Sequence, residues 1–225
     1  MTGEIGASPP GGIVIISYPL IGDFVRTHTL VRILRARHPD TPIDIVARRP
    51  SVEIAALRPE VRNGIAETFQ RNRLDLGARL DLARRLRRNR YRTAIVSSRA
   101  WKAALLPFLA GIPERIGWFG EARYPLINRP RFGERRHRRF VEYVASLGLN
   151  TGEELPQAWP PPQLVIPETT MQQWRATAPE ANDARPILML APGARGPERM
   201  WPVEKFAGLA RRAVDKGWTL SLIHI

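Results

Sequence analysis

Short apolar runs alternate with amphipathic stretches along the first 150 residues of the chain. Three runs are rich in β-branched residues: GIVIIS at 12–17, which is uninterrupted, PIDIVAR at 42–48 and TAIVSS at 93–98. Such runs are typical of strands that are covered on both faces. NGIAETF at 63–69 and RIGWFG at 115–120 are weaker strand candidates. The pattern therefore predicts up to five strands in this part of the chain.

Helical periodicity fills the intervals between these strands. Apolar positions three or four residues apart predict longer helices over 23–38, 74–91, 99–111 and 138–149. Ser51 is the candidate N-cap of a shorter helix that follows it. Strand, helix and strand joined by short connections require right-handed crossovers and a parallel sheet. The sequence therefore predicts an α/β fold, with a doubly wound, Rossmann-like domain over residues 1–150.

The composition changes near residue 150. ELPQAWPPPQLVIPE at 154–168 contains five prolines, so we interpret residues 151–185 as a proline-rich linker and connecting helix. The alternation then restarts with a strand near 187–191 and a helix near 202–216. The 40 residues of 186–225 are too few to enclose an α/β core. We therefore expect a second Rossmann-like domain that is only begun, in the front part of a longer protein.

Charge and composition limit the class of partner. The chain has 35 Lys and Arg against 21 Asp and Glu, a net charge of +14, and 32 of its cations are arginine. This balance favours anionic partners, namely nucleic acid, acidic lipid surfaces or phosphorylated substrates. The absence of cysteine excludes disulfides and thiolate chemistry and favours a reducing compartment. The longest apolar stretch, 103–112, is too short to span a bilayer, so we expect any membrane contact to be peripheral.

The turn after the first predicted strand carries the first candidate for chemistry. Ligands of open α/β sheets bind at the carboxyl ends of the strands, beside helix N-termini. Asp23 stands at such a turn, behind Gly22, which allows a ligand to approach the backbone closely. The carboxylate can cap the helix, and it can also act as a general base toward a substrate hydroxyl. The residues alone leave both roles open.

A second candidate is APGARGPERMWP at 191–202, the turn after the first strand of the second cycle. It is neither a dinucleotide-binding fingerprint nor a P-loop. Arg195 and Arg199, with Gly193, lie in a loop that leads to a helix N-terminus, which favours binding of a phosphate or diphosphate. A solvated loop in an arginine-rich chain is an equally good interpretation. The four histidines show no metal-ligand spacing.

These two loops, together with AGIPERIGWFGEARYPLIN at 110–128, resemble the ADP-heptose:lipopolysaccharide heptosyltransferases of glycosyltransferase family 9. The resemblance is greatest to the heptosyltransferase II branch. The matching signatures are IGD at 21–23, the long middle signature, and PGA at 192–194 followed by MWPVEKFAGLA at 200–210. The similarity extends from about residue 13 to 218, and the middle signature is the specific one.

The resemblance implies a GT-B fold and an inverting transfer of heptose from ADP-heptose to the inner core of lipopolysaccharide. Asp23 takes the place of the family's proposed general base. Arg199 stands where the family usually has lysine, and the family's DSG motif, which grips the nucleotide sugar, is absent. We therefore expect this polypeptide by itself to be inactive. The residues expected to bind substrate are Gly22, Trp118, Glu121, Arg123, Tyr124, Gly193, Arg195 and Arg199, and no metal or other cofactor is expected.

The resemblance also suggests a purpose for the arginines clustered between 123 and 139. They are expected to face the acceptor, which is lipid A with its core sugars, or the inner leaflet of the cytoplasmic membrane. The implied location is cytoplasmic and peripheral, at the inner face of the inner membrane. Two alternatives stay open: a related glycosyltransferase that uses another nucleotide sugar, and a basic nucleic-acid-binding α/β protein. The chain has no recognised nucleic-acid-binding motif, so nucleic acid is not expected as a partner.

Overall fold

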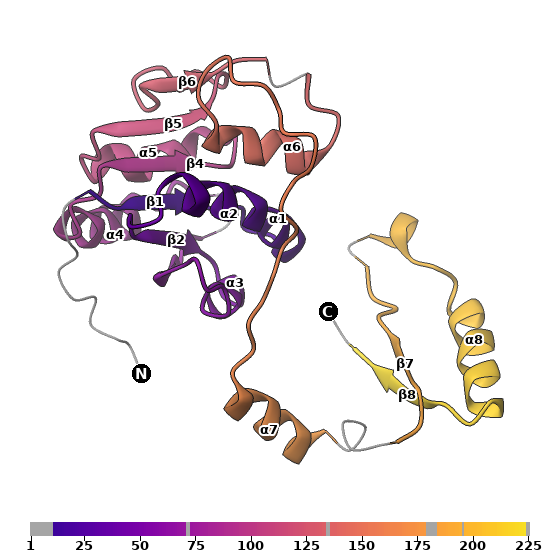
Figure 1. Cartoon of the computed structure of the whole chain (residues 1–225). Coiled ribbons are helices and arrows are strands. Elements are labelled where there is room, and N and C mark those ends of the chain that lie inside the picture. Colours follow the sequence, from indigo (N-terminus) through magenta and orange to yellow (C-terminus); the bar gives the residue numbers. More distant parts are fainter. Residues whose placement is uncertain (1–10, 71–72, 134–135, 179–183, 195, 224–225) are drawn as a thin grey trace. The chain divides into compact units, whose positions relative to one another are not determined.

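A computed structural model describes residues 11–223, except 71–72, 134–135, 179–183 and 195. The chain forms two compact units, Met1–Val165 and Ile166–Ile225 (Figure 1). Within the described ranges, no helix is both long and apolar enough to cross a membrane.

The first unit is built on a six-stranded parallel sheet in the order β3-β2-β1-β4-β5-β6. This is the strand order of a doubly wound dinucleotide-binding sheet. Successive strands are added on one side of β1 up to β3 and on the other side from β4 onward, so the order reverses between β1 and β4. The predicted α/β fold is thus confirmed for this unit. Its strands are β1 (Ile13–Ile16), β2 (Ile43–Ala47), β3 (Asn63–Ala66), β4 (Thr93–Val96), β5 (Glu114–Trp118) and β6 (Arg129–Arg131).

Helices cover both faces of this sheet (Figure 1). Alternate residues of β1 point to opposite sides, so Val14 joins the core formed with α4 and α5, and Ile15 joins the core formed with α1, α2 and α6. The helices are α1 (Ile21–Arg26), α2 (His28–Arg37), α3 (Ser51–Ala55), α4 (Leu76–Arg88), α5 (Trp101–Leu109) and α6 (Phe140–Ala145).

Two local predictions about helices are wrong. The helix expected over 23–38 is divided into α1 and α2 at Thr27, whose buried hydroxyl donates to the Asp23 carbonyl at 2.8 Å. Such bonds from a threonine side chain to the preceding turn bend helices. Ser51 does not cap α3. Pro50 occupies the N-cap position, and the buried Ser51 hydroxyl has no hydrogen-bond partner among the described residues.

Residues 154–167 of the proline-rich segment form no helix or strand, and part of this segment is fastened to the first unit. The Gln163 N–H donates to His28 Nδ1 at 3.0 Å, and the Val165 N–H donates to the Leu57 carbonyl at 2.8 Å. Thr29 and Arg32 of α2 donate to the carbonyls of Pro160 and Pro161. The division between the two compact units accordingly falls after Val165.

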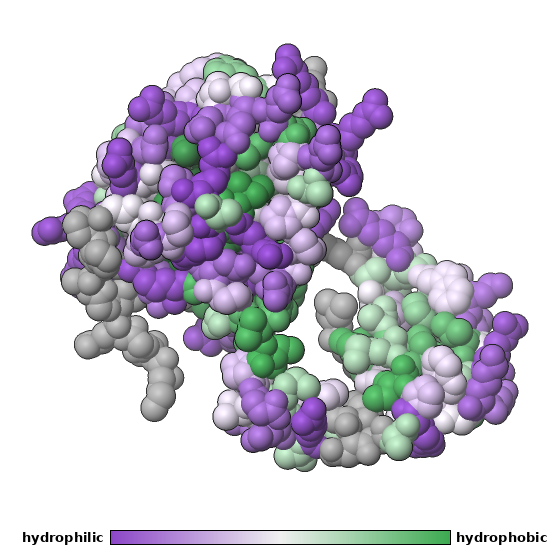
Figure 2. Space-filling view, in the orientation of Figure 1, coloured by the Kyte–Doolittle hydropathy of each residue, from purple (hydrophilic) through white to green (hydrophobic). Residues whose placement is uncertain are grey.

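The second unit repeats the strand–helix–strand pattern that the sequence predicts. It contains α7 (Glu168–Thr177), β7 (Ile187–Leu190), a 3-10 turn at Pro197–Arg199, α8 (Val203–Asp215) and β8 (Thr219–Leu222). β7 and β8 pair in parallel. Figure 2 shows predominantly hydrophilic side chains over the first unit and a concentration of hydrophobic ones around β7 and β8. Ile187 and Met189 of β7 are 39% and 55% exposed.

Candidate active site

The carboxyl ends of the six parallel strands meet at one edge of the first unit. The strand order reverses between β1 and β4, and ligands of such sheets bind in the crevice at that point. The turn after β1 leads into α1, where Asp23 is the third helical residue. Leu20 occupies the N-cap position, without a side-chain hydrogen bond. Of the two roles that the sequence leaves open for Asp23, helix capping is therefore wrong, and the role of base stays a prediction.

An ion pair orients the Asp23 carboxylate. Arg26 Nη2 lies 2.5 Å from Asp23 Oδ1, one helical turn along α1. The same guanidinium donates to the Gly22 carbonyl at 3.3 Å and lies 4.3 Å from the centre of the Phe140 ring. The Asp23 side chain is 23% exposed. A hydroxyl group from solvent can therefore reach this carboxylate while Arg26 holds its direction.

Tyr18, on the turn after β1, lies close to this carboxylate. Its ring packs against Phe140 at 5.1 Å between centroids, and its hydroxyl interacts with Tyr143. Burial raises the pKa of Tyr18 far above its ordinary value, Tyr143 and Asp23 raise it further, and Arg123 opposes them. The phenol is thus neutral at physiological pH. Sequence reasoning missed Tyr18, because its partners come together only when α6 packs beside β1.

Trp118 and Arg123 of the middle signature lie beneath this edge of the sheet. Trp118 is 3% exposed, stacks on Tyr143 at 5.0 Å, and donates from Nε1 to the Tyr143 carbonyl at 3.1 Å. Arg123 is 2% exposed and donates to the carbonyls of Ser98 (2.8 Å), Gly120 (3.3 Å) and Trp118. These side chains are predicted to contact substrate, but in this geometry they support the loops that follow β4 and β5.

Three other predicted site residues are accessible. Gly22 is exposed, and a Cβ added there would meet nothing within 4 Å. Glu121 is exposed, and Tyr124 is 65% exposed. Glu121 adopts a left-handed conformation (φ 51°), as does Ala122 (φ 52°), so the chain turns sharply just before Arg123. Gly22, Glu121 and Tyr124 therefore remain candidates for contact with substrate.

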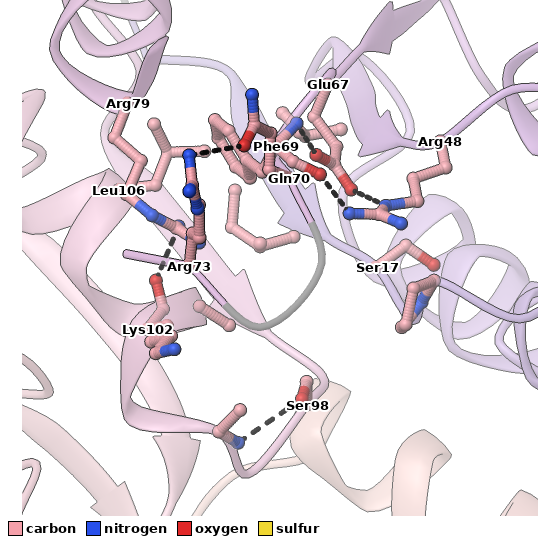
Figure 3. A pocket seen from close by; sticks show the side chains of 15 residues that line it. Ser17, Arg48, Glu67, Phe69, Gln70, Arg73, Arg79, Ser98, Lys102 and Leu106 are labelled. Carbon is pink, nitrogen blue, oxygen red and sulfur yellow. Dashed lines mark hydrogen bonds and ion pairs between the residues drawn. The ribbon is translucent and has the colours of Figure 1, made fainter. Parts of the chain in front are cut away.

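A cavity of about 290 Å³ opens at the carboxyl ends of β1–β4, on the side of α4 and α5 (Figure 3). Ser17 and Ser98, which follow the two central strands, line it. Arg48 Nε donates to Glu67 Oε1 at 2.6 Å, and the same guanidinium donates to the Phe69 carbonyl. These contacts fix one wall of the cavity.

The opposite wall is held by a buried arginine. Arg79 is 6% exposed and donates to the carbonyls of Leu74 (2.6 Å) and Lys102 (2.7 Å). Its guanidinium also lies 4.1 Å from the centre of the Phe69 ring. Burial lowers the pKa of Arg79, but a guanidinium stays protonated at physiological pH. The lining carries four cationic side chains against Glu67 (Arg48, Arg73, Arg79 and Lys102), which favours an anionic ligand.

Sequence reasoning missed this cavity, because its residues come from four strand ends and two helices. Each arginine taken alone resembles a surface cation. A usable signal was nevertheless present: Ser17, Arg48 and Ser98 are the last residues of predicted strands, and Glu67 lies near the end of another. The carboxyl ends of parallel strands share an edge, so polar residues at these positions become neighbours.

The arginine-bearing turn of the second unit is described apart from Arg195, which lies outside the described residues. Gly193 is exposed. Arg199 ends the 3-10 turn, its side chain is 74% exposed, and its Nε lies 3.7 Å from Glu198 Oε1. The prediction that Gly193, Arg195 and Arg199 bind a phosphate group stays a prediction.

Comparisons with known proteins agree with the resemblance drawn from the sequence. A family model described as glycosyltransferase family 9 (heptosyltransferase) matches residues 79–224. Lipopolysaccharide heptosyltransferase 2 of Escherichia coli K12 is 33% identical in a 217-residue alignment that covers 93% of this chain and 62% of that protein. The Salmonella typhimurium protein of the same name is 32% identical over the same shares of both chains. The chain thus spans about 62% of the length of these curated relatives.

Solved structures show the same fold. The structure of E. coli ADP-heptose lps heptosyltransferase II superposes with a TM-score of 0.83 at 32% identity, covering 94% of this chain and 63% of that one. A glycosyl transferase family 9 structure from Veillonella parvula gives a TM-score of 0.78 at 16% identity, covering 95% and 62%. E. coli heptosyltransferase WaaC with ADP gives 0.67 at 18%, covering 93% and 65%. The last two are similar in fold alone.

Proposed function

Because this chain belongs to glycosyltransferase family 9, the heptosyltransferases, we propose that the protein transfers a heptose from ADP-heptose to a hydroxyl group of the lipopolysaccharide inner core. The observation that carries the proposal is the 33% identity to a lipopolysaccharide heptosyltransferase over 93% of the chain. The accessible carboxylate of Asp23, at the sheet edge where ligands of this fold bind, adds to its support.

In the proposed mechanism Asp23 is the general base. An acceptor hydroxyl oxygen attacks the anomeric carbon of the heptose, and its proton passes to the Asp23 carboxylate. The bond from that carbon to the diphosphate oxygen breaks, and ADP leaves with the electron pair. A single displacement of this kind inverts the anomeric configuration. Arg26 orients the base at 2.5 Å, and Gly22 leaves space for the acceptor, since no Cβ projects there.

The charged groups have separate tasks in this proposal. The cavity between Arg48 and Arg79 binds an acidic group of the acceptor, because its lining carries more cations than carboxylates. Gly193, Arg195 and Arg199 hold the donor diphosphate, without a metal ion or other cofactor. The protein acts at the inner face of the cytoplasmic membrane, where its exposed arginines meet anionic lipid headgroups.

The test compares two proteins, because the chain spans about 62% of the length of its E. coli relative. One is the 225-residue chain, and the other is this chain extended by the remaining carboxyl-terminal part of that relative. Each is incubated with ADP-heptose and a heptose-deficient core acceptor, and the product is detected by mass spectrometry. We expect the extended chain to transfer heptose. Failure to transfer heptose, or faster transfer from another nucleotide sugar, would contradict the proposed substrate.

A matched pair of variants tests the base. Asp23→Asn in the extended chain is expected to lower kcat by about 10²–10⁴-fold. Asp81→Asn is the control, because Asp81 is also exposed on a helix and pairs with an arginine three residues ahead, Arg84, at 2.6 Å. A rate that is unchanged in Asp23→Asn would refute the assigned role, whatever the donor sugar.

A further inference from the structure

Three exposed aromatic rings gather at the same sheet edge as Asp23. Phe119 follows β5, Phe132 follows β6, and Tyr124 lies on the loop between these strands. The Tyr124 and Phe132 ring centroids lie 4.9 and 4.8 Å from that of Phe119. The three residues are 38% (Phe119), 65% (Tyr124) and 63% (Phe132) exposed. We call this cluster the aromatic platform.

The backbone beneath the platform is firmly held. The Phe119 N–H donates to the Arg131 carbonyl at 2.8 Å, which joins the ends of β5 and β6. Arg123, directly before Tyr124, is buried and donates to three carbonyls of the adjoining loops. Glu121 and Ala122 keep left-handed conformations that side-chain-bearing residues rarely adopt. A rigid, solvent-exposed group of rings loses little conformational freedom when it binds a ligand.

A continuous series of contacts links the platform to the candidate base. Trp118, the neighbour of Phe119 in the chain, stacks on Tyr143 at 5.0 Å. The Tyr143 ring lies 6.2 Å from that of Phe140 between centroids. Arg26 lies 4.3 Å from the centre of the Phe140 ring and pairs with Asp23 at 2.5 Å. Packed side chains thus join the platform and the candidate base at the same edge of the sheet.

The chemistry around the rings indicates the kind of ligand. Exposed aromatic faces attract the polarised C–H groups of a sugar ring, since the face of the π-system is negative. Guanidinium groups approach the same loops: Arg99 Nη2 would lie 3.3 Å from a Cβ at Gly120, and Arg136 Nε 3.6 Å from one at Gly133. Arginines beside an aromatic surface can donate hydrogen bonds to the carboxylate or phosphate groups of an acidic saccharide.

A carboxylate in the same loop distinguishes a saccharide from a membrane. Glu121 is exposed three residues before Tyr124. A carboxylate accepts hydrogen bonds from sugar hydroxyls, whereas an anionic lipid surface repels it. We propose that Phe119, Tyr124 and Phe132 stack against a sugar ring of the acidic acceptor saccharide and so bind it at the sheet edge that carries Asp23. This inference rests on the proposed function.

The experiment uses the deacylated, water-soluble inner-core oligosaccharide as the probe. Its binding to the full 225-residue chain is measured by calorimetry, and its KM is measured with the extended chain. Phe132→Ala and Tyr124→Ala are each expected to weaken binding and raise the acceptor KM about tenfold. The kcat and the KM for ADP-heptose stay unchanged, and Tyr124→Phe, which keeps the ring, behaves like the original protein.

Phe108→Ala is the matched control, because Phe108 is 43% exposed on α5 and its ring lies 5.5 Å from a guanidinium, that of Arg115. Equal oligosaccharide binding by the platform variants, the control and the original chain would overturn the inference. So would variants that lose only binding to phosphatidylglycerol vesicles, because the platform would then contact the membrane. If the extended chain transfers no heptose but the oligosaccharide still binds through the platform, the proposed function fails and the assigned ligand class stands.

Discussion

His28, the first residue of α2, is predicted to make the stability of the first unit depend on pH. Its side chain is fully buried. Nδ1 accepts a hydrogen bond from the Gln163 N–H at 3.0 Å, so this nitrogen carries no proton. Nε2 lies 3.0 Å from Glu60 Oε2 and therefore donates. Protonating the ring would place two N–H groups against each other and break the contact that holds Gln163.

The direction of the effect follows from the groups around the ring. Burial lowers the pKa of His28, the hydrogen bond to Glu60 raises it, and Arg58 lowers it, with a net decrease. The unfolded chain therefore takes up a proton near pH 6.5, whereas the folded chain does so only at lower pH. The stabilising effect of the neutral ring is complete above about pH 6.5 and is lost as the pH falls below that value. One proton corresponds to a slope of at most about 1.4 kcal/mol per pH unit.

Glu60 acts in a different pH range. Burial tends to raise its pKa, but the hydrogen bond with His28, its own backbone N–H, the charge of His28 and Arg32 together lower it. Its stabilising effect is therefore lost only below about pH 4.5. His137 acts in the same direction as His28, since burial lowers its pKa as well. A variant at each histidine is needed to separate their contributions.

The assay is urea unfolding between pH 5.0 and 7.5, followed by tryptophan fluorescence. His28→Gln retains a donor toward Glu60, and His28→Asn retains an acceptor toward Gln163, but neither titrates. We expect both variants to lose about 1 kcal/mol of the pH dependence between pH 6.5 and 5.5, and His137→Asn to keep that part. Hydrogen exchange at the Gln163 amide should show a corresponding loss of protection at low pH in the original chain. Equal pH dependence of the original protein and His28→Gln would refute this reasoning.

Two further predictions concern buried polar side chains. Arg123→Lys keeps the charge, but the lysine side chain cannot reach the three carbonyls that the guanidinium joins. Hydrogen exchange over 118–124 should therefore accelerate, and the acceptor KM should rise. Unchanged exchange would contradict the positioning role. Asp44→Ala removes a fully buried carboxylate that accepts from Arg62 Nε at 3.0 Å and from the Tyr91 hydroxyl. It should reduce the free energy of unfolding by about 3–5 kcal/mol, against less than about 0.5 kcal/mol for Asp81→Ala, as measured in urea.

The fold could be predicted because a parallel sheet covered on both faces produces uninterrupted apolar runs. β1 and β4 are of this kind, and β2 departs from it only at Asp44. The structure places each of the three within one or two residues of the predicted range. β6 could not be predicted, because Arg129–Arg131 has three residues, no apolar side chain except proline, and lies at the sheet edge. Edge strands bury little surface, so their sequences carry little signal.

The candidate site could be predicted only in part. The strand-end rule located Asp23, because the position of a turn after a buried strand depends on local sequence. The burial of Trp118 depends on a contact with Tyr143, 25 residues later, and that of Arg123 depends on the Ser98 carbonyl, on the turn after β4. No local pattern encodes such contacts. The resemblance instead led us to expect Arg123 to face the acceptor.

The hydrogen-bond partners of the arginines change how the net charge should be interpreted. Several guanidinium groups in the first unit bind backbone carbonyls and not carboxylates: Arg35 reaches those of Pro39, Thr41 and Glu60, and Arg115 reaches those of Ile112 and Leu126. The ends of helices leave carbonyls without partners, and the planar guanidinium, with five donors, can satisfy several of them at once. These arginines are required by the fold whether or not an anionic partner exists. A net charge of +14 therefore overstates the surface that nucleic acid or lipid can contact.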